Sequence, residues 1–590
     1  MSATDATGPG AGGAGGRAAG RAAGLLGLPD GYGKEGLRAD AVAGLSLVVV
    51  LIPQAMAFSA LVGVPPVAGL YSALVSLLAY GLLGSSAGLS FGPIAVVSLL
   101  SGAAVAPLAG GDVERALALV GLLAVMVGVI HVGLSLLRAG AIVDVISYPV
   151  LLGFTAGAGF TIASSQVRDL LGIVASGSDR FVEAISIVAP LLGDLHPLTA
   201  VIGVGSLVLL LVTRSVRPSF PTVLVLAVVA VAASALFGLE GRGVRIVGDI
   251  PSGFPVPRVP AVAPDDARDL LASALAIALV GYAQTIAVGK AIAARTRQRI
   301  DSNREFRASG VANIASGFFG GFPTSGSLSL SSVLGAAGAR SRVALGVAAL
   351  ALTTVLLLLT PLLEPLPRVI LAALIMAAVV SFIDVPGFLE LFRIDRGEGS
   401  VALVTLVTAL TLGLLEGLAL GVGTNLAIHV VRRMRPDIVE LGRVHGTLQY
   451  RNRTRYPSVV ADDGAIVRVD GAIDFLDASA VGTQLRRLVA ARPELRWVVL
   501  DASGVTELDA TGLRMLAGLV EGFHTAGVEM RLVSLRGPLR DTIERGGARE
   551  LLLDRCSRTS LHDALESVGV DAAHPLRTPA EGERQPDGFR

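Results

Sequence analysis

Long apolar runs separated by short polar segments occupy the chain from about residue 40 to residue 431. An apolar run of about 17 to 25 residues suits a single helical crossing of a bilayer. Two shorter runs, residues 92–105 and 326–337, cannot span a bilayer alone, and counting them gives about fourteen segments. Full-length crossings are expected near residues 40–59, 66–84, 114–137, 141–166, 196–213, 219–238, 266–294, 301–319, 340–361, 366–383, 398–413 and 415–431.

A different pattern follows residue 432, where charged residues become frequent and short apolar strands alternate with amphipathic helical stretches. Strand candidates such as AIVRVD, WVVLDA and EMRLVSL lie between helix candidates such as ATGLRMLAGLVEGF. This alternation predicts an α/β layer structure. We therefore expect a disordered amino-terminal tail (1–24), a membrane domain (25–434), a linker (435–460), an α/β domain (461–570) and a disordered carboxyl-terminal tail (571–590).

The segment GFPTSGSLSLSS, from Gly321 to Ser332, interrupts the apolar region with small and polar residues. Irregular backbone at membrane depth is tolerated only where it is buried in protein or lines a wet cavity, so this segment predicts a broken helix beside a cavity. Residues 80–102 and 316–338 share a Gly-rich approach, a Pro or Gly break and a short apolar segment. With seven segments in each half, such a repeat is inverted and places a binding site near the bilayer midplane.

Two half-helices that begin at about Gly92 and Gly326 would direct their amino termini at one point from opposite sides. Each terminus carries about half a positive charge and several unpaired N–H groups. This arrangement predicts a pocket that binds anions. The hydroxyl groups of Ser325, Ser327 and Ser329 either add donors to the pocket or bond to their own backbone and neighbouring helices.

Several segments together resemble the sulfate-permease (SulP) family of anion transporters. They are LIPQAMAF at Leu51, VGVPPVAGLYSAL at Val62, LSFGPIAVVSLLSG at Leu89, PVLLGFTAGAG at Pro149 and SGSLSLSS at Ser325. GRVHGTLQYRNRTRYP at Gly442 is similar to the linker of that family, and WVVLDASGVTELDATGLRML at Trp497 resembles the core of its cytoplasmic STAS domain. The resemblance covers nearly the whole chain, and its segments occur in the order that the family shows.

The resemblance implies about fourteen segments in a seven-plus-seven inverted repeat, in which a core domain carries the anion past a gate domain by an elevator-like movement. It implies a homodimer embedded in the lipid of the plasma membrane, with a STAS domain available to a cytoplasmic protein partner. The residues expected around the anion are Gln54, Phe58, Gly92, Pro93, Ile94, Gln284, Ser325, Gly326, Ser327, Leu328 and Ser329.

Two positions depart from the family pattern. Many members carry an acidic residue on the eighth helix and an arginine after SGSLS, whereas this chain has Gln284 and Leu330. Proton or sodium coupling through that carboxylate is therefore in doubt, and about one positive charge from two helix ends suits a monoanion such as chloride or bicarbonate better than sulfate. His131 is a candidate for proton coupling, and the alternative is a neutral histidine bonded to a backbone carbonyl group.

Composition and charge agree with a polytopic membrane protein, because 52% of the residues are hydrophobic and only 16% are charged. The single cysteine, Cys556, excludes an internal disulfide framework, and no basic stripe with interleaved aromatic residues indicates nucleic-acid binding. No motif indicates an enzyme, a cofactor or a metal site. Short cytoplasmic loops are enriched in Lys and Arg, and the distribution of arginines therefore predicts that both termini are cytoplasmic. The residues placed on this side are Arg138, Arg214, Arg217, Arg295, Arg297, Arg299, Arg340, Arg342, Arg393, Arg396, Arg432 and Arg433.

The expected STAS domain contains the turn DATG, with Asp509 directly before a helical stretch and Thr511 inside the turn. Asp509 suits a helix N-cap. The turn also corresponds to the regulatory turn of related stand-alone STAS proteins, although their phosphorylatable serine is replaced by Ala510. We expect secondary active transport of a small inorganic anion of the sulfate, bicarbonate or chloride class. The alternatives are a nucleobase-type permease of the same architecture and a non-transporting anion sensor that signals through its STAS domain.

Overall fold

The computed structural model describes residues 28, 32–86, 88–138, 147–174, 181–217, 220–296, 301–444, 447, 449–558, 560–569 and 576–577. The expected tails lie outside these residues, apart from the short strand β11 (Leu576–Arg577), and so do Arg297 and Arg299. The chain divides into two compact units, Met1–Asn425 and Leu426–Arg590.

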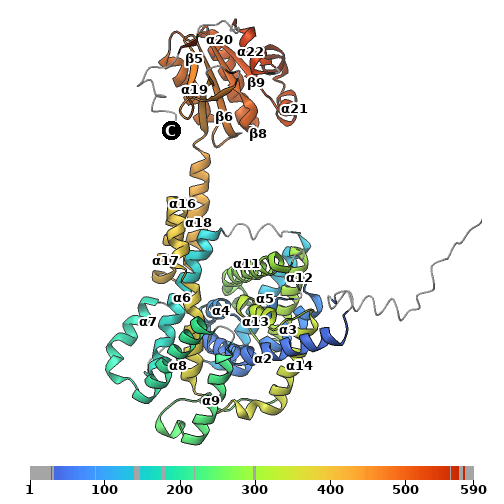
Figure 1. Ribbon diagram of the computed structural model, residues 1–590, viewed down its shortest axis with the longest axis vertical. Helices are drawn as coiled ribbons and strands as arrows, with labels where there is room; N and C mark the ends of the chain where they lie inside the picture. Colours follow the sequence, from blue (N-terminus) through green and yellow to red (C-terminus); the bar gives the residue numbers. More distant parts are fainter. Residues whose placement is uncertain are drawn as a thin grey trace, which may run out of the picture. The chain divides into compact units, whose positions relative to one another are not determined.

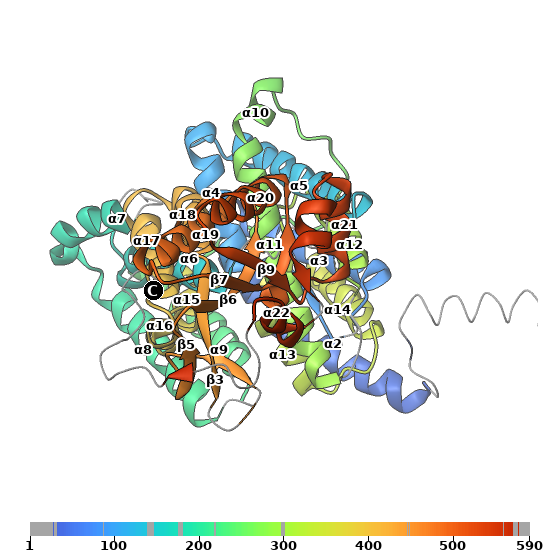
Figure 2. The same cartoon turned by 90° about the horizontal axis from the view of Figure 1, so that it is seen from above.

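Two helical bundles make up the first unit, and Figures 1 and 2 show them side by side. The first bundle contains α2 (Lys34–Val62), α3 (Pro66–Leu83), α4 (Ala95–Ala109), α5 (Val113–Leu136), α11 (Leu271–Thr296), α12 (Ser302–Phe318), α13 (Leu328–Ala336) and α14 (Val343–Thr354). The second bundle contains α6 (Tyr148–Leu171), α8 (Pro197–Val216), α9 (Thr222–Phe237), α15 (Arg368–Val379), α17 (Arg396–Thr411) and α18 (Leu414–Arg433).

Each expected membrane segment corresponds to one of these helices, and eight of the described helices are long and apolar enough to cross a membrane. The sequence pattern did not predict three short helices, α7 (Phe181–Val188), α10 (Pro264–Asp269) and α16 (Val385–Ile394). They are too short to stand out as separate periodic segments beside the long apolar runs.

The packing of the helices repeats between the two halves of the chain. In chain order, the seven helices α2, α3, α4, α5, α6, α8 and α9 correspond to α11, α12, α13, α14, α15, α17 and α18. Under this correspondence, the contact of α5 with α12 matches that of α14 with α3, and the contact of α6 with α17 matches that of α15 with α8. The predicted seven-plus-seven repeat is therefore present in the packing.

Glycine residues bring α5 and α12 unusually close together. A Cβ atom on Gly317 of α12 would lie 2.3 Å from the carbonyl oxygen of Gly121 on α5. One Cβ on Gly310 would lie 2.8 Å from the carbonyl oxygen of Gly128. Small residues at such positions allow helix backbones to approach in a membrane, where van der Waals contact is a main source of helix association. These glycines therefore allow the two helices to pack backbone against backbone.

The second unit is an α/β domain built on a sheet with strand order β10-β9-β7-β6-β3-β5-β11, in which β4 pairs with β3 and β8 with β6. Strands β6, β7, β9 and β10 are parallel, and β3 pairs with β6 in the antiparallel sense. The strands are β3 (Asp437–Val444), β4 (Tyr450–Asn452), β5 (Ser458–Ala461), β6 (Gly464–Ile473), β7 (Trp497–Asp501), β8 (Val505–Leu508), β9 (Glu529–Val533) and β10 (Ser557–Arg558).

Apolar residues on both faces of this sheet are buried. Val467 and Leu500 pack in one cluster with Leu485 of α19 (Ala478–Ala491) and Leu516 of α20 (Ala510–Thr525). Ile543 of α21 (Gly537–Arg545) belongs to the same cluster. On the opposite face, α22 (Leu561–Ser567) covers a smaller cluster around Ile466 and Trp497. Both faces are apolar because successive side chains of a strand point to opposite sides.

Residues 435–460 differ from the expected linker, because they contain β3, β4 and β5 of the sheet. Strand β3 pairs along β6 from Asp437 opposite Asp470 to Leu441 opposite Ile466. The alternating pattern of these residues is interrupted by charges, and their pairing partners lie further along the chain, so a local reading of the sequence finds only a polar connection. The α/β domain therefore begins at Asp437.

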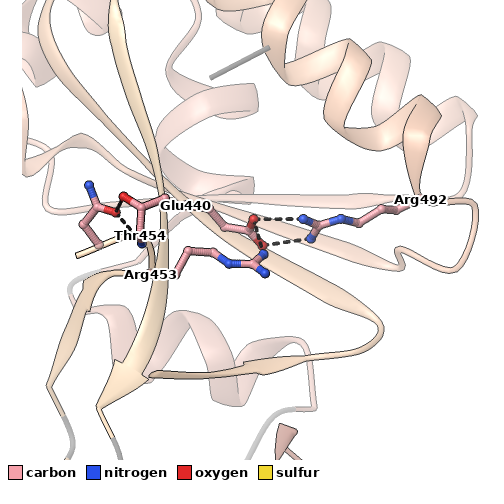
Figure 3. A network of polar contacts seen from close by, with 5 residues as sticks. Glu440, Arg453, Thr454 and Arg492 are labelled. Atoms are coloured by element: carbon pink, nitrogen blue, oxygen red, sulfur yellow. Dashed lines mark hydrogen bonds and ion pairs between the residues drawn. The ribbon is translucent and has the colours of Figure 1, made fainter. Parts of the chain in front are cut away.

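A buried carboxylate ties this early part of the domain to the rest, as Figure 3 shows. Glu440 on β3 is 1% exposed and accepts hydrogen bonds from Arg492 at 2.8 and 2.9 Å and from Arg453 at 2.6 Å. Burial alone would raise the pKa of Glu440, but the hydrogen bonds of Arg492 and the charges of both arginines lower it below its usual range. The triad therefore links β3, the β4–β5 turn and the end of α19.

Candidate functional site

The centre of the first bundle is an antiparallel crossing of two short extended segments. Strand β1 (Ser90–Gly92) pairs with β2 (Ser325–Ser327), so that Ser90 lies opposite Ser327, Phe91 opposite Gly326 and Gly92 opposite Ser325. The helices begin slightly later than predicted, at Ala95 for α4 and Leu328 for α13. Because the strands are antiparallel, the two helices leave the crossing in opposite directions and both present their amino termini to it.

Helix α11 holds β2 through hydroxyl groups. The Ser325 hydroxyl donates to the carbonyl oxygen of Gly281 and lies 3.0 Å from the Thr285 hydroxyl oxygen. The Gly326 N–H donates to that same Thr285 oxygen at 3.0 Å. A Cβ atom on Gly326 would lie 3.0 Å from the Cα of Thr285, which explains why glycine occupies this position. Of the two interpretations of Ser325, bonding to a neighbouring helix is therefore the one observed.

An asparagine on α12 fixes the residue before β2. The side-chain oxygen of Asn313 accepts from the Thr324 N–H at 2.7 Å, and its amide nitrogen donates to the Thr324 carbonyl oxygen at 3.1 Å. The Thr324 hydroxyl also pairs with Ser76 of α3 at 2.8 Å. All three residues are nearly inaccessible to solvent. The sequence analysis missed Asn313. Its signal in the sequence is a single amide side chain among the small and apolar residues of GVANIASGFF.

Strand β1 is held at Ser90 and Phe91 and through the loop that precedes it. The Ser90 N–H donates to the Ser331 hydroxyl oxygen on α13 at 2.9 Å. The Phe91 ring stacks on Tyr80, with ring centroids 5.2 Å apart. The Tyr80 hydroxyl donates to Glu305 on α12 at 2.8 Å, and Glu305 also accepts from the Ser85 N–H at 2.8 Å. Glu305 therefore positions the loop that leads into β1.

One face of α2 approaches the crossing. Residues Leu51, Gln54 and Phe58 share this face because they are spaced by three and four positions. A Cβ atom on Gly92 would lie 4.0 Å from Leu51, which brings β1 against this face of α2. Gln54 is half-buried and Phe58 is 7% exposed. The predicted site residues Gln54 and Phe58 therefore belong to the side of α2 that meets the half-helices.

The two residues that depart from the family pattern occupy different surroundings. Gln284 is half-buried on α11, next to Thr285 and three residues from Gly281, the two residues that hold β2. Leu330 is completely buried in α13, and its N–H donates to the Ser327 hydroxyl oxygen at 3.3 Å. Leu330 therefore takes part in packing, while Gln284 has a side chain that remains partly accessible.

The start of α13 is the most accessible part of the crossing. Leu328 is 58% exposed and Ser329 is exposed, whereas Ile94, the N-cap of α4, is 8% exposed. Gly92, Pro93 and Gly326 are buried. Ser327 is the N-cap of α13 and accepts the Leu330 N–H, so its own hydroxyl proton is not used in that bond.

The electrostatics of this crossing come from backbone groups. None of the predicted anion-site side chains carries a charge. Two helix amino termini together supply about one positive charge, together with N–H groups that have no partner inside their own helix. Such a region attracts an anion without a fixed cation.

Comparison with known proteins identifies the family. Residues 37–405 match the sulfate permease family, and residues 456–564 match the STAS domain. The chain belongs to the sulfate permease family. The chain is 33% identical over 514 residues to the probable sulfate transporter MT1781 of Mycobacterium tuberculosis, covering 87% of this chain and 92% of that protein. It is 30% identical over 550 residues to the chloroplastic sulfate transporter 4.1 of Arabidopsis thaliana, covering 90% and 80%.

Solved structures share the fold of this chain. The murine Slc26a9 anion transporter in its inward-facing state has a TM-score of 0.86 and 26% identity, covering 94% of this chain and 95% of that chain. The transmembrane domain of the cyanobacterial bicarbonate transporter BicA has a TM-score of 0.59 and 23% identity, covering 65% of this chain and 98% of that chain. This family member is therefore a multi-pass membrane protein with a carboxyl-terminal STAS domain.

His131 lies outside the crossing, on α5, and faces α11 and α12. Its Nε2 atom is 2.9 Å from the carbonyl oxygen of Ala278, and its ring lies 5.9 Å from Tyr282 and 5.8 Å from Phe306. A carbonyl oxygen can only accept, so Nε2 carries a proton. This geometry matches the alternative of a histidine bonded to a backbone carbonyl group, and the coupling role of His131 stays a prediction.

The DATG turn of the STAS domain has a clear structural role. One carboxylate oxygen of Asp509 accepts from the Gly512 N–H at 2.7 Å and caps α20, as predicted. The other accepts from the Phe475 N–H at 2.9 Å, which fixes the loop between β6 and α19. Thr511 is exposed in the first turn of α20. A regulatory role of this turn stays a prediction.

Proposed function

We propose that this protein carries a small inorganic anion of the sulfate, bicarbonate or chloride class across the plasma membrane by secondary active transport. The observation that carries the proposal is the antiparallel pairing of β1 with β2, from which α4 and α13 leave in opposite directions. The similar proteins include a probable sulfate transporter, a bicarbonate transporter and the Slc26a9 anion transporter, which supports an anion as the substrate.

In our proposal, the anion lies between the amino termini of α4 and α13, beside Gln54, Phe58, Ile94 and Ser329. The amide of Gln54 donates to the anion, and the positive edge of the Phe58 ring faces it. Backbone dipoles supply a moderate positive charge. Because that charge is not a cationic side chain, the substrate forms no permanent ion pair. Such a site holds an anion strongly enough to select it and weakly enough to release it.

We propose that the first bundle moves against the second as an elevator. The helices of the first bundle contact one another extensively, as α5 does α12 and α2 does α14, and α4 and α13 pack on α2, so in our proposal substrate and site travel together. The second bundle meets the first mainly through α15 and α9 against α2 and through α6 against α4. An interface made by few elements suits a sliding movement between two bodies.

The proposal includes orientation, assembly and ion coupling. Arginines concentrated in the loops on one side, by the positive-inside rule, support cytoplasmic termini and a cytoplasmic STAS domain. We also propose a homodimer and a STAS domain that contacts a cytoplasmic protein. Because Gln284 cannot ionise, transport of the wild-type protein is expected to be independent of a proton gradient.

The deciding experiment is uptake of labelled sulfate, bicarbonate and chloride into proteoliposomes that contain the purified full-length chain, with and without a pH gradient. We expect saturable uptake of at least one anion that is indifferent to the gradient, and a gradient-driven component in Gln284→Glu. A protein that binds these anions but transports none of them would act as a sensor and would contradict the proposal.

A matched variant separates coupling from transport. If wild-type uptake already follows the pH gradient, His131→Phe tests the remaining candidate, since phenylalanine fills the ring site between Tyr282 and Phe306 but cannot titrate. Loss of the gradient dependence with retention of uptake would assign coupling to His131. Retention of the gradient dependence would assign it to neither residue.

A further inference from the structure

Helix α16 carries three chemically distinct sides. Gly387 and Leu391 are buried, and Leu391 packs in a cluster with Leu152 of α6 and Ala402 of α17. Val385, Leu389 and Phe392 are 55%, 58% and 39% exposed, and their spacing of four and three positions aligns them in one stripe. Glu390 and Arg393, both exposed, occupy the remaining side.

The lengths of the flanking helices indicate how deep α16 lies relative to the membrane. Helix α17 has 16 residues and follows α16 after the single residue Asp395. At about 1.5 Å per residue it extends about 24 Å, which is less than the hydrocarbon thickness of about 30 Å. Helix α15, which precedes α16, has 12 residues and is shorter still. Helices of this length keep the segment between them close to the hydrocarbon core, which supports a position of the exposed apolar stripe at the membrane boundary.

The surroundings of α16 are typical of a membrane–water interface. The hydroxyl group of Tyr148, at the first turn of α6, lies against Gly387, and the Tyr148 side chain is 57% exposed. Tyrosine is enriched at the level of the lipid headgroups. Arg393 and Arg396 are exposed at the end of α16, and cationic residues on an amphipathic helix attract anionic headgroups.

A second helix of this kind occurs at the equivalent place in the other half of the chain. Helix α7 follows the fifth helix of the first half, as α16 follows the fifth helix of the second half. Ala184 and Val188 of α7 are buried, whereas Val182 and Ile185 are 55% and 46% exposed. In an inverted repeat the two helices belong to opposite faces of the membrane.

From these observations we infer that α16 is an interfacial helix whose Val385–Leu389–Phe392 stripe inserts between phospholipids, with Arg393 and Arg396 at anionic headgroups. Helix α7 is its counterpart in the other leaflet. Together they anchor the second bundle to both surfaces of the bilayer. This bundle then resists vertical displacement, which gives the first bundle a fixed body to move against. The lipid contact itself does not depend on the proposed substrate.

Site-directed spin labelling of the full-length protein tests this inference. Cys556 is the single cysteine and is 2% exposed, so an introduced cysteine is labelled selectively, with the unmutated protein as the labelling control. Leu389→Cys and the adjacent Glu390→Cys form a matched pair on different sides of α16. Each labelled protein is reconstituted into vesicles of phosphatidylethanolamine and phosphatidylglycerol. The accessibility of the spin label to oxygen and to a nickel chelate is then measured.

We expect the label at residue 389 to favour oxygen and to lie about 5–10 Å below the headgroup level, the depth of interfacial helices. The label at residue 390 should favour the nickel chelate. Val385→Cys provides a second position on the stripe if Leu389→Cys does not fold.

Two outcomes overturn the inference. If residues 389 and 385 favour the nickel chelate as residue 390 does, the stripe faces water. If both reagents are excluded at 389 and 385, protein covers the stripe, and the occupant is a second copy or another part of this chain. The uptake assay is independent of either result, so failure here does not imply failure of anion transport.

Discussion

At the β1–β2 crossing, buried polar groups are hydroxyl, amide and backbone groups without a charged side chain, whereas the STAS domain buries Glu440 between Arg453 and Arg492. The carboxylate of the STAS triad is satisfied by hydrogen bonds, whereas the buried Ser90 hydroxyl of the crossing has no partner within the described residues. The STAS carboxylate has permanent partners, so its charge is fully compensated and its role is to hold strands together. The crossing has helix termini but no fixed anion, which leaves its positive potential free for a mobile one.

The largest effect is expected when the permanent anion is removed. In Glu440→Ala, Arg453, whose side chain is 8% exposed, loses its buried counter-ion. Breaking a buried ion pair from one side costs about 3–5 kcal/mol. Trp497 is the single tryptophan of the chain and lies in the STAS domain. Its fluorescence during denaturant unfolding of the full-length protein therefore reports this domain.

An exposed pair provides the control for Glu440. Glu544 bonds to Arg549 at 3.0 Å, and both side chains are exposed, by 45% and 63%. Glu544→Ala should cost about 0–1 kcal/mol, as for exposed pairs. Equal losses for the two variants would contradict the view that the Glu440 triad is a structural centre.

The second effect concerns the neutral centre. Asn313→Leu removes the hydrogen bonds to both backbone groups of Thr324. Leaving buried groups unpaired costs about 1–3 kcal/mol each, and β2 should lose its fixed position, so that the maximal rate of anion uptake falls. The measurements are thermal unfolding of the purified protein and uptake into proteoliposomes.

Asn303→Leu is the matched control on the same helix, because its side-chain oxygen has no hydrogen-bond partner within the described residues. It should leave uptake close to that of the wild type. If the two asparagine variants lose uptake equally, the loss reflects general damage to α12 and not the position of β2.

A smaller effect is expected at the accessible end of α13. Ser329→Val removes a hydroxyl donor from the proposed site, and loss of about 1 kcal/mol of hydrogen bonding corresponds to about a fivefold rise in KM. Ser332→Val is the control one turn later, since the Ser332 hydroxyl donates to the Leu328 carbonyl oxygen. An unchanged KM in Ser329→Val would remove Ser329 from the site.

Acid provides the smallest and most graded change. Because the pKa of Glu440 is lowered in the folded domain, its contribution to stability is complete above the carboxyl pKa of the unfolded chain, about 4.3. It is lost as the pH falls further, through the folded value. Trp497 fluorescence should show this acid-dependent loss of stability in the wild type and a weaker one in Glu440→Gln. An identical pH dependence would contradict the assignment.

The sequence predicted those features that depend on local composition or on a repeated pattern. Apolar run lengths identified the membrane helices, and the similarity of residues 80–102 to 316–338 led to the paired half-helices. Asp509 was recognisable as an N-cap because its hydrogen bond to Gly512 is local.

Features that depend on distant partners were not predictable in this way. In the sequence, Glu440 is indistinguishable from other charged residues. Its role depends on the pairing of β3 with β6 and on the hydrogen bond from Arg492, 52 positions later. The role of Asn313 depends on the fold of the segment after α12, which brings the backbone of Thr324 within hydrogen-bonding distance of the Asn313 side chain. The half-helices begin two or three residues after Gly92 and Gly326, because the short strands between them pair across the repeat.

The crossing of β1 and β2 also constrains how the protein is made. Ser90 bonds to Ser331, 241 positions later in the chain. At synthesis rates of roughly 5–20 residues per second, the first partner waits on the order of ten seconds or longer for the second. During this interval α4, with 15 residues, is in the membrane without the strand that completes its amino-terminal end. Biogenesis therefore needs the insertion machinery or its associated chaperones to shelter this half-finished segment until the second half of the chain arrives.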